Sequence, residues 1–111
     1  MPYVTEREGE IWRVILRTVS EIYTLHWREI LDGGRPQRVV EARQLGMTLT
    51  REFTGLPYAQ VSALWGKTHA NVMWGEKRIA ALSEVDSKVS DRVKRARKMV
   101  KRWIKTEEAS V

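Results

Sequence analysis

Apolar residues recur at helical intervals in every long segment of this chain, and glycine or proline separates the segments. From Glu6 to about His26, the residues Ile11, Ile15 and Val19 step by four, which places them on one side of a helix. No segment shows the strict apolar and polar alternation that is typical of strands. The pattern predicts an all-α fold, a compact helical domain of about five to six helices.

A short helix and a loop follow the first helix. The residues HWREIL at 26–31 predict this second helix. The next five residues, Asp32 to Pro36, include two glycines and a proline, which are typical of irregular structure. We therefore expect Arg35 in a flexible basic loop.

The third predicted helix has two different faces. Its apolar face carries Val39, Ala42, Leu45, Leu49 and Phe53, whereas its opposite face carries Arg43, Gln44, Met47 and Arg51. The apolar side is expected to enter the core and the opposite side to stay exposed. Thr54 and Gly55 predict the end of the helix, because glycine commonly follows a helix C-terminus.

A helix-turn-helix pattern occupies residues 58–85. A short helix at about 58–65 precedes the turn Trp65-Gly66-Lys67-Thr68, and Thr68 is a good N-cap for a helix that runs from His69 to about Val85. The inner face of that helix carries Val72, Gly75, Ile79 and Leu82, and its outer face carries Ala70, Trp74, Lys77 and Ala81. In such an arrangement the second helix enters the DNA major groove.

The C-terminal helix, at 87–106, is strongly basic. From residue 86 onward the chain has nine basic and four acidic residues. Three interpretations are open: a surface that follows phosphates, a dimer or protein-partner seam built on the apolar spacing from Val89 to Trp103, or a packed helix with a solvated basic face. We favour packing on the domain, with the Lys/Arg face assisting DNA affinity.

Composition narrows the function classes. The 111 residues suit one domain, 1–111. The chain has 20 Lys plus Arg and 14 Asp plus Glu, a net charge of +6 that favours an anionic partner.

The residue types also argue against several kinds of site. There is no cysteine, and His26 and His69 lie far apart, so we expect no metal, no cofactor and no enzyme activity. The residues GKT at 66–68 resemble the end of a nucleotide-binding P-loop, but Val61 occupies the position of the first P-loop glycine. We therefore expect no nucleotide binding. The acidic N-terminus is no signal peptide, so we expect a cytoplasmic protein and no membrane association.

Two segments resemble a known family. ARQLGMTLTREFTG at 42–55 parallels the R-Q-x-x-M-x-L-x-[KR]-E-x-T run of the C-terminal, origin-binding domain of the bacterial replication initiator DnaA, and THANVMWGEKRI at 68–79 parallels its second signature. The resemblance implies a Trp-repressor-like helix-turn-helix that binds duplex DNA at the nucleoid, here as a stand-alone chain without the initiator's ATPase domain.

The resemblance also implies roles for individual residues. Arg35 would enter the minor groove, His69 would begin the recognition helix at the base edges, and Arg78 would reach the DNA backbone. Arg43, Gln44 and Arg51 would contact phosphates. The complete set of candidate DNA-binding residues is Arg35, Arg43, Gln44, Arg51, Lys67, Thr68, His69, Ala70, Asn71, Trp74, Lys77 and Arg78.

The second signature departs from the family pattern. Thr68 stands for its Asp, Ala70 and Asn71 for its two Thr, and Trp74 for its later His. We therefore predict a duplex binder, sequence-specific but not necessarily for the initiator's box, that controls replication initiation, transcription or a mobile element in bacteria or phage. The alternative is a protein-interaction module that kept the fold and lost specific DNA binding.

Two residues of this segment leave alternatives open. Asn71 either contacts adenine in a bidentate manner or satisfies the local backbone at the helix start. Trp74 either contacts a thymine methyl group or the sugar backbone, or packs on a neighbouring helix.

Overall fold

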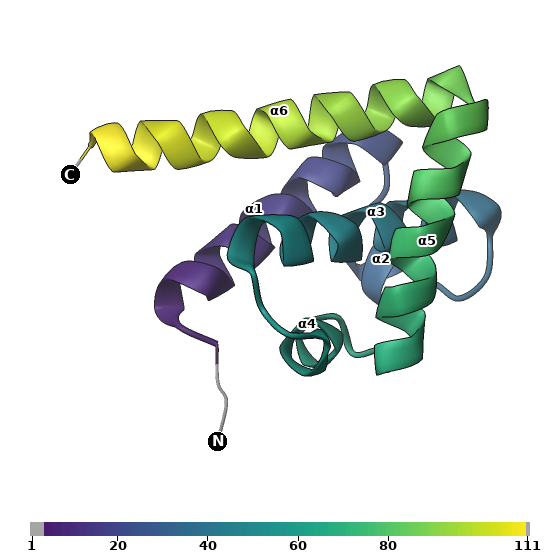
Figure 1. The fold of residues 1–111 in the computed structure, drawn as a ribbon, viewed down its shortest axis with the longest axis horizontal. Helices are drawn as coiled ribbons and strands as arrows, with labels where there is room; N and C mark the ends of the chain where they lie inside the picture. Colours follow the sequence, from purple (N-terminus) through teal and green to yellow (C-terminus); the bar gives the residue numbers. More distant parts are fainter. Residues whose placement is uncertain (1–3, 111) are drawn as a thin grey trace.

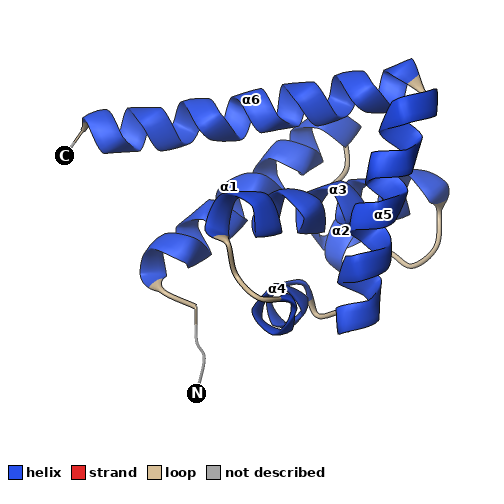
Figure 2. Ribbon diagram, in the orientation of Figure 1, coloured by secondary structure: helices blue, strands red, loops and turns tan. Residues whose placement is uncertain are grey.

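The computed structural model describes residues 4–110, which form six α-helices and no strand (Figure 1, Figure 2). In chain order the helices are α1 (Glu6–Tyr23), α2 (Trp27–Asp32), α3 (Gln37–Thr54), α4 (Tyr58–Trp65), α5 (His69–Val85) and α6 (Ser87–Ala109). The predicted all-α fold class is confirmed.

α3 is the central helix. α1 and α5 make the most extensive contacts with it, α2 and α4 also pack on it, and α6 packs on α1 and α5. A single apolar core takes buried side chains from all six helices, and Trp65 and Tyr23 are the largest of them. In Figure 1, α6 runs along the upper side of the molecule, whereas α4 and the start of α5 lie at the lower side. α4 and the start of α5 are therefore at the side opposite α6, whereas the end of α5 contacts α6.

Local capping determines the helix boundaries around this unit. The Thr68 hydroxyl accepts a hydrogen bond from the Asn71 backbone N–H, at 3.2 Å, and the Asn71 side chain accepts one from the Thr68 N–H, at 3.3 Å. Gly55 and Gly66 end α3 and α4 with φ of 68° and 65°, values that favour glycine. The predicted cap at Thr68 and the predicted helix end at Gly55 are confirmed.

One face of α3 differs from the prediction. Met47 was expected on an exposed face, but it is 2% exposed, and Arg43, Gln44 and Arg51 are only half-exposed. The reason is that α5 packs on this side of α3, which Gly75 permits: a Cβ at Gly75 would lie 3.2 Å from Met47 Cε. α3 is thus covered on more sides than its own periodicity indicates.

α6 packs on the domain, as the favoured interpretation predicts. Its buried side chains are Val89, Val93, Ala96 and Val100. Two ion pairs join α6 to α3, Arg92 with Glu41 at 3.0 Å and Arg97 with Glu52 at 2.7 Å. The helix continues to Ala109, three residues beyond the predicted end. Among residues 4–110, no helix is both long enough and apolar enough to cross a bilayer.

Candidate nucleic-acid interface

The helix-turn-helix is anchored to α3 by one aromatic residue at the end of α4. Trp65 is 1% exposed, and its ring lies over Gly46, where an added Cβ would approach it to 2.3 Å. Its indole N–H donates a hydrogen bond to the Thr50 hydroxyl at 3.1 Å. The turn from Trp65 to the start of α5 at His69 is short, so the first turn of α5 stays close to this anchor, where its residues are exposed.

A carboxylate fixes α4, α5 and α3 relative to one another. Glu76 of α5 accepts a hydrogen bond from the Tyr58 hydroxyl of α4 at 2.7 Å and from Arg51 Nε of α3 at 3.2 Å. The Arg51 guanidinium carbon also lies 3.8 Å from the centre of the Tyr58 ring, which is a cation–π contact. The hydrogen bond to Glu76 raises the pKa of Tyr58 above its usual value. These polar contacts join α5 to both α4 and α3.

Arg51 has a partner within the protein that the sequence did not predict. Its Nε donates to Glu76 and its side chain is 31% exposed, and its contact with phosphate stays a prediction. Neither Tyr58 nor Glu76 was a candidate residue. In the sequence, each is only a polar residue near the predicted contact between α4 and α5. Polarity alone does not show which residue each one binds.

The outer face of α5 presents apolar and basic side chains together. Trp74 is 66% exposed and Met73 is 43% exposed. Lys77 Nζ lies 5.4 Å from the centre of the Trp74 ring. The alternative that Trp74 packs on a neighbouring helix is therefore wrong. Met73 was not a candidate; its position one turn after His69 was the signal that could have identified it.

The first turn of α5 combines capping with exposure. Asn71 satisfies the local backbone through the capping box with Thr68, as one of its two interpretations predicted. His69 and Ala70 are exposed, and the His69 ring lies 6.4 Å from the Tyr58 ring between centroids. The helix N-terminus, with its outward-pointing backbone N–H groups, adds partial positive charge at this position.

Arg43 holds the loop that carries Arg35. Its Nε donates to the Ile30 carbonyl at 2.7 Å and its Nη2 donates to the Gly34 carbonyl at 3.3 Å. Burial lowers the pKa of Arg43, and the carboxylate of Asp32 opposes this effect. Arg35 itself is exposed in the loop between α2 and α3. Arg43 thus positions the basic loop in addition to carrying charge.

Four candidate residues from three parts of the chain meet at one pocket beside the start of α5. Arg43 and Gln44 of α3, Lys67 of the turn and Asn71 of α5 all line it. The structure does not bring the whole candidate set together, since Arg51 belongs to the Glu76 network and Arg78 is exposed further along α5. We define the α5 surface as the turn residue Lys67 together with the exposed residues of α5 from its start to Lys77 that face away from the core. These residues are Lys67, His69, Ala70, Asn71, Met73, Trp74 and Lys77.

Comparison with known proteins identifies the family. Residues 12–79 match the model of the bacterial DnaA protein helix-turn-helix family. The chain belongs to this family. The matched range begins in α1 and ends in α5, so it contains α3, the α4–α5 unit and the loop with Arg35. Membership of the DnaA helix-turn-helix family points to DNA binding.

Curated relatives agree with this assignment. The chain is 32% identical over 88 residues to the chromosomal replication initiator protein DnaA of Corynebacterium jeikeium, an alignment that covers 78% of this chain. It is 33% identical over 76 residues to DnaA of Thermus thermophilus and 35% identical over 77 residues to DnaA of Synechocystis, each covering 68% of this chain. The alignments span only 15 to 17% of the length of these DnaA proteins.

Proposed function

We propose that this chain binds duplex DNA with sequence preference through the α5 surface, with the start of α5 in the major groove. The observation that carries the proposal is the exposed outer face of α5: Trp74 and Met73 are exposed on a capped helix that contacts of Glu76 and Trp65 join to α4 and α3. A large apolar side chain kept exposed beside cations suits a contact with base edges and the thymine methyl group.

The flanking cations supply the sequence-independent part of binding. Lys67 and Lys77 belong to the α5 surface, Arg35 lies in the loop between α2 and α3, and Arg78 follows Lys77 in the sequence. Phosphate contacts of this kind fix the register of a protein on the duplex, and contacts to base edges carry the specificity. The proposed biological role is occupancy of sites that control replication initiation, transcription or a mobile element.

The first test is a titration of duplex DNA at several salt concentrations. If four to six phosphates are neutralised, the logarithm of the binding constant should fall with the logarithm of salt with a slope of about −4 to −5. Selection of bound sequences from a random duplex library then establishes whether a preferred site exists. A flat salt dependence, or no retardation of any duplex at low salt, would favour the protein-interaction alternative.

A pair of variants on one helix tests the recognition face. Trp74→Ala should weaken binding to the selected duplex by about 1 to 2 kcal/mol, since it removes an apolar contact surface. Val85→Ala is the matched control: Val85 is 83% exposed at the far end of α5 and should leave affinity unchanged. Both variants should unfold at the wild-type denaturant concentration, because neither side chain is buried. Equal affinity in both variants would contradict the placement of Trp74 at the DNA.

A further inference from the structure

A second cationic surface lies on α6, away from the α5 surface. Between Arg92 and Thr106 the sequence has eight basic residues and no acidic residue. Arg92 and Arg97 pair with carboxylates of α3, while the remaining cations of this stretch have no carboxylate within ion-pair distance among residues 4–110. The α6 helix therefore carries charge that the protein itself does not neutralise.

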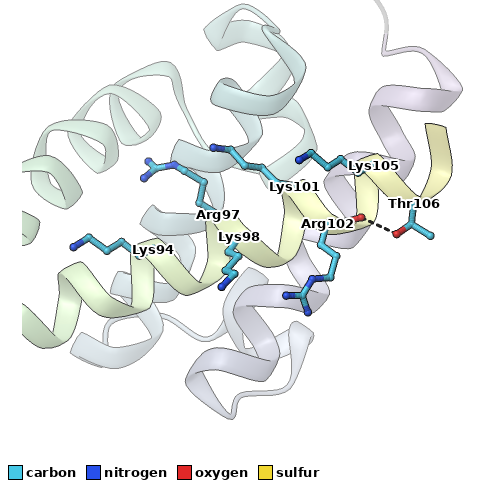
Figure 3. Close-up of a pocket in the computed structure, with 7 residues that line it drawn as sticks. All are labelled: Lys94, Arg97, Lys98, Lys101, Arg102, Lys105 and Thr106. Atoms are coloured by element: carbon cyan, nitrogen blue, oxygen red, sulfur yellow. Dashed lines mark hydrogen bonds between the residues drawn. The ribbon is translucent and has the colours of Figure 1, made fainter. Parts of the chain in front are cut away.

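The charges on α6 are aligned. Lys94, Lys98, Lys101 and Lys105 are spaced by four, three and four residues, which places them on one face of the helix over about 16 Å. Arg102 and Arg97 border this row, and the six side chains line one open depression. From this face, the side chains of Lys98 and Arg102 diverge to one side of the helix axis and those of Lys101 and Lys105 to the other (Figure 3). We call these six residues the α6 ridge.

The ridge is unfavourable for the isolated protein. Like charges four residues apart on a helix, such as Lys94 with Lys98 or Lys101 with Lys105, destabilise it by about 0.2 to 0.5 kcal/mol per pair. A row of phosphates would convert this repulsion into attraction and release the counterions of the polyanion. The chemistry of the ridge therefore fits a nucleic-acid backbone.

The same chemistry argues against a membrane surface as the partner. A helix that lies in a bilayer interface needs apolar side chains on the face that enters the lipid. The buried face of α6, which includes Val93 and Val100, is covered by the rest of the protein, and the ridge on the other face is entirely cationic and polar.

The α6 ridge belongs to a helix that lies on the opposite side of the molecule from the start of α5. The 17 residues of α5 span about 25 Å, and α6 starts at the end of α5 opposite His69. The major groove is only about 8.5 Å deep, so the C-terminal half of an inserted α5 leaves the groove. Figure 1 shows α6 crossing the molecule on the side opposite α4.

We propose that the α6 ridge binds a second DNA duplex, so that one chain bridges two DNA segments. The inference rests on the proposed function for the first duplex. The second contact is to phosphates alone, since lysines in a row carry no pattern of base recognition. It is therefore expected to be independent of sequence and more sensitive to salt than the first.

The experiment is a capture assay with the full chain. A duplex that carries the selected site is immobilised, the protein is added, and a labelled duplex of scrambled sequence follows. The ridge variant is Lys98→Glu with Lys101→Glu; the control is Arg13→Glu with Arg17→Glu, an equal change of charge at exposed positions of α1. A solution titration with the site duplex and a molar mass measurement accompany each protein.

Wild type and control should capture the labelled duplex, and the ridge variant should lose at least about tenfold of that capture, since two phosphate contacts are reversed. Its affinity for the site duplex should stay within about threefold of wild type, because charges beyond about 8 Å are largely screened at physiological salt.

Four outcomes would overturn the inference. They are no capture by wild type, with or without its retention on phosphatidylserine vesicles; equal loss in ridge variant and control; parallel loss of site-duplex affinity in the ridge variant; and capture only by a dimer. If the solution titration shows no binding of the site duplex by wild type, the proposed function itself fails, and this result is separate from the capture arm.

Discussion

Gly46 of α3 lies against the indole of Trp65, so closely that a Cβ at Gly46 would come within 2.3 Å of the ring. Trp65 is the last residue of α4, and its N–H is bound by Thr50 one turn further along α3. This contact joins the central helix to the helix-turn-helix. The position of the α5 surface therefore depends on the absence of a side chain at residue 46.

The first prediction is that Gly46→Ala destabilises the protein. Alanine improves helix propensity by about 0.5 to 1 kcal/mol, but overpacking of a closed core costs about 1 to 3 kcal/mol. The clash should dominate because Trp65 is 1% exposed and has no free direction to move, giving a net loss of about 1 to 2 kcal/mol. Urea unfolding measures it.

Gly9→Ala in α1 is the control for Gly46→Ala. The nearest atom to a Cβ at Gly9 is Arg13 Nη1 at 3.7 Å, an ordinary contact with a flexible side chain. This variant should gain about 0.5 to 1 kcal/mol from helix propensity alone. If both variants shift stability in the same direction, the contact between Gly46 and Trp65 does not limit packing.

The second prediction compares the two ion pairs that join α6 to α3. The Glu41 side chain is 9% exposed and also accepts a hydrogen bond from the Tyr23 hydroxyl. Arg92→Met leaves this carboxylate without its cation and should cost about 2 kcal/mol, a value reduced from that of a fully buried pair because Arg92 is 25% exposed.

Arg97→Met tests the exposed pair in the same way. Arg97 and Glu52 have side chains 35% and 37% exposed, so this loss should be at most about 1 kcal/mol. Thermal and urea unfolding of both variants gives the comparison. Equal losses would show that burial of Glu41 does not determine the strength of the α3–α6 contact.

The third prediction concerns alkaline pH. Burial, reinforced by the Glu41 carboxylate, raises the pKa of Tyr23, and the hydrogen bond to Glu76 raises the pKa of Tyr58. In the unfolded chain both tyrosines ionise near pH 10. Their contribution to stability is therefore complete below about pH 10 and is lost as the pH rises toward the folded-state pKa.

Urea unfolding between pH 8 and 11 checks this effect, with Tyr23→Phe as the comparison. The variant lacks the buried hydroxyl, so its stability should fall less steeply above about pH 10 than that of the wild type. Parallel curves for the two proteins would contradict the assignment to Tyr23.

The fourth prediction concerns Asn71. Because its side-chain oxygen already accepts from the Thr68 N–H, we expect capping to be its main role. Asn71→Ala should then weaken the selected and the scrambled duplex by the same factor and lower stability by about 1 kcal/mol, as should Thr68→Ala. Paired titrations measure this. A loss confined to the selected duplex, about 1 to 3 kcal/mol, would instead assign a bidentate base contact to Asn71.

The helices and their ends could be predicted from the sequence because the signals are local. The cap at Thr68 depends on residues within one turn of helix, and the helix end at Gly55 depends on a single backbone conformation. The inner position of Gly75 follows from the spacing of the apolar residues around it. The exposed start of α5 also follows from its own periodicity. The family resemblance rests on the same short segments.

The state of the α3 surface was decided only by the tertiary structure. Met47 is buried and Arg51 donates to Glu76 because α5 packs across that face of α3. Glu76 lies 25 residues after Arg51 in the sequence. Helical periodicity identifies which residues share a face, but not how many neighbouring helices cover it. The sequence by itself determined the helices and the exposed face of α5, because these depend on local signals. Packing between distant helices decided which side chains of α3 are buried or paired within the protein.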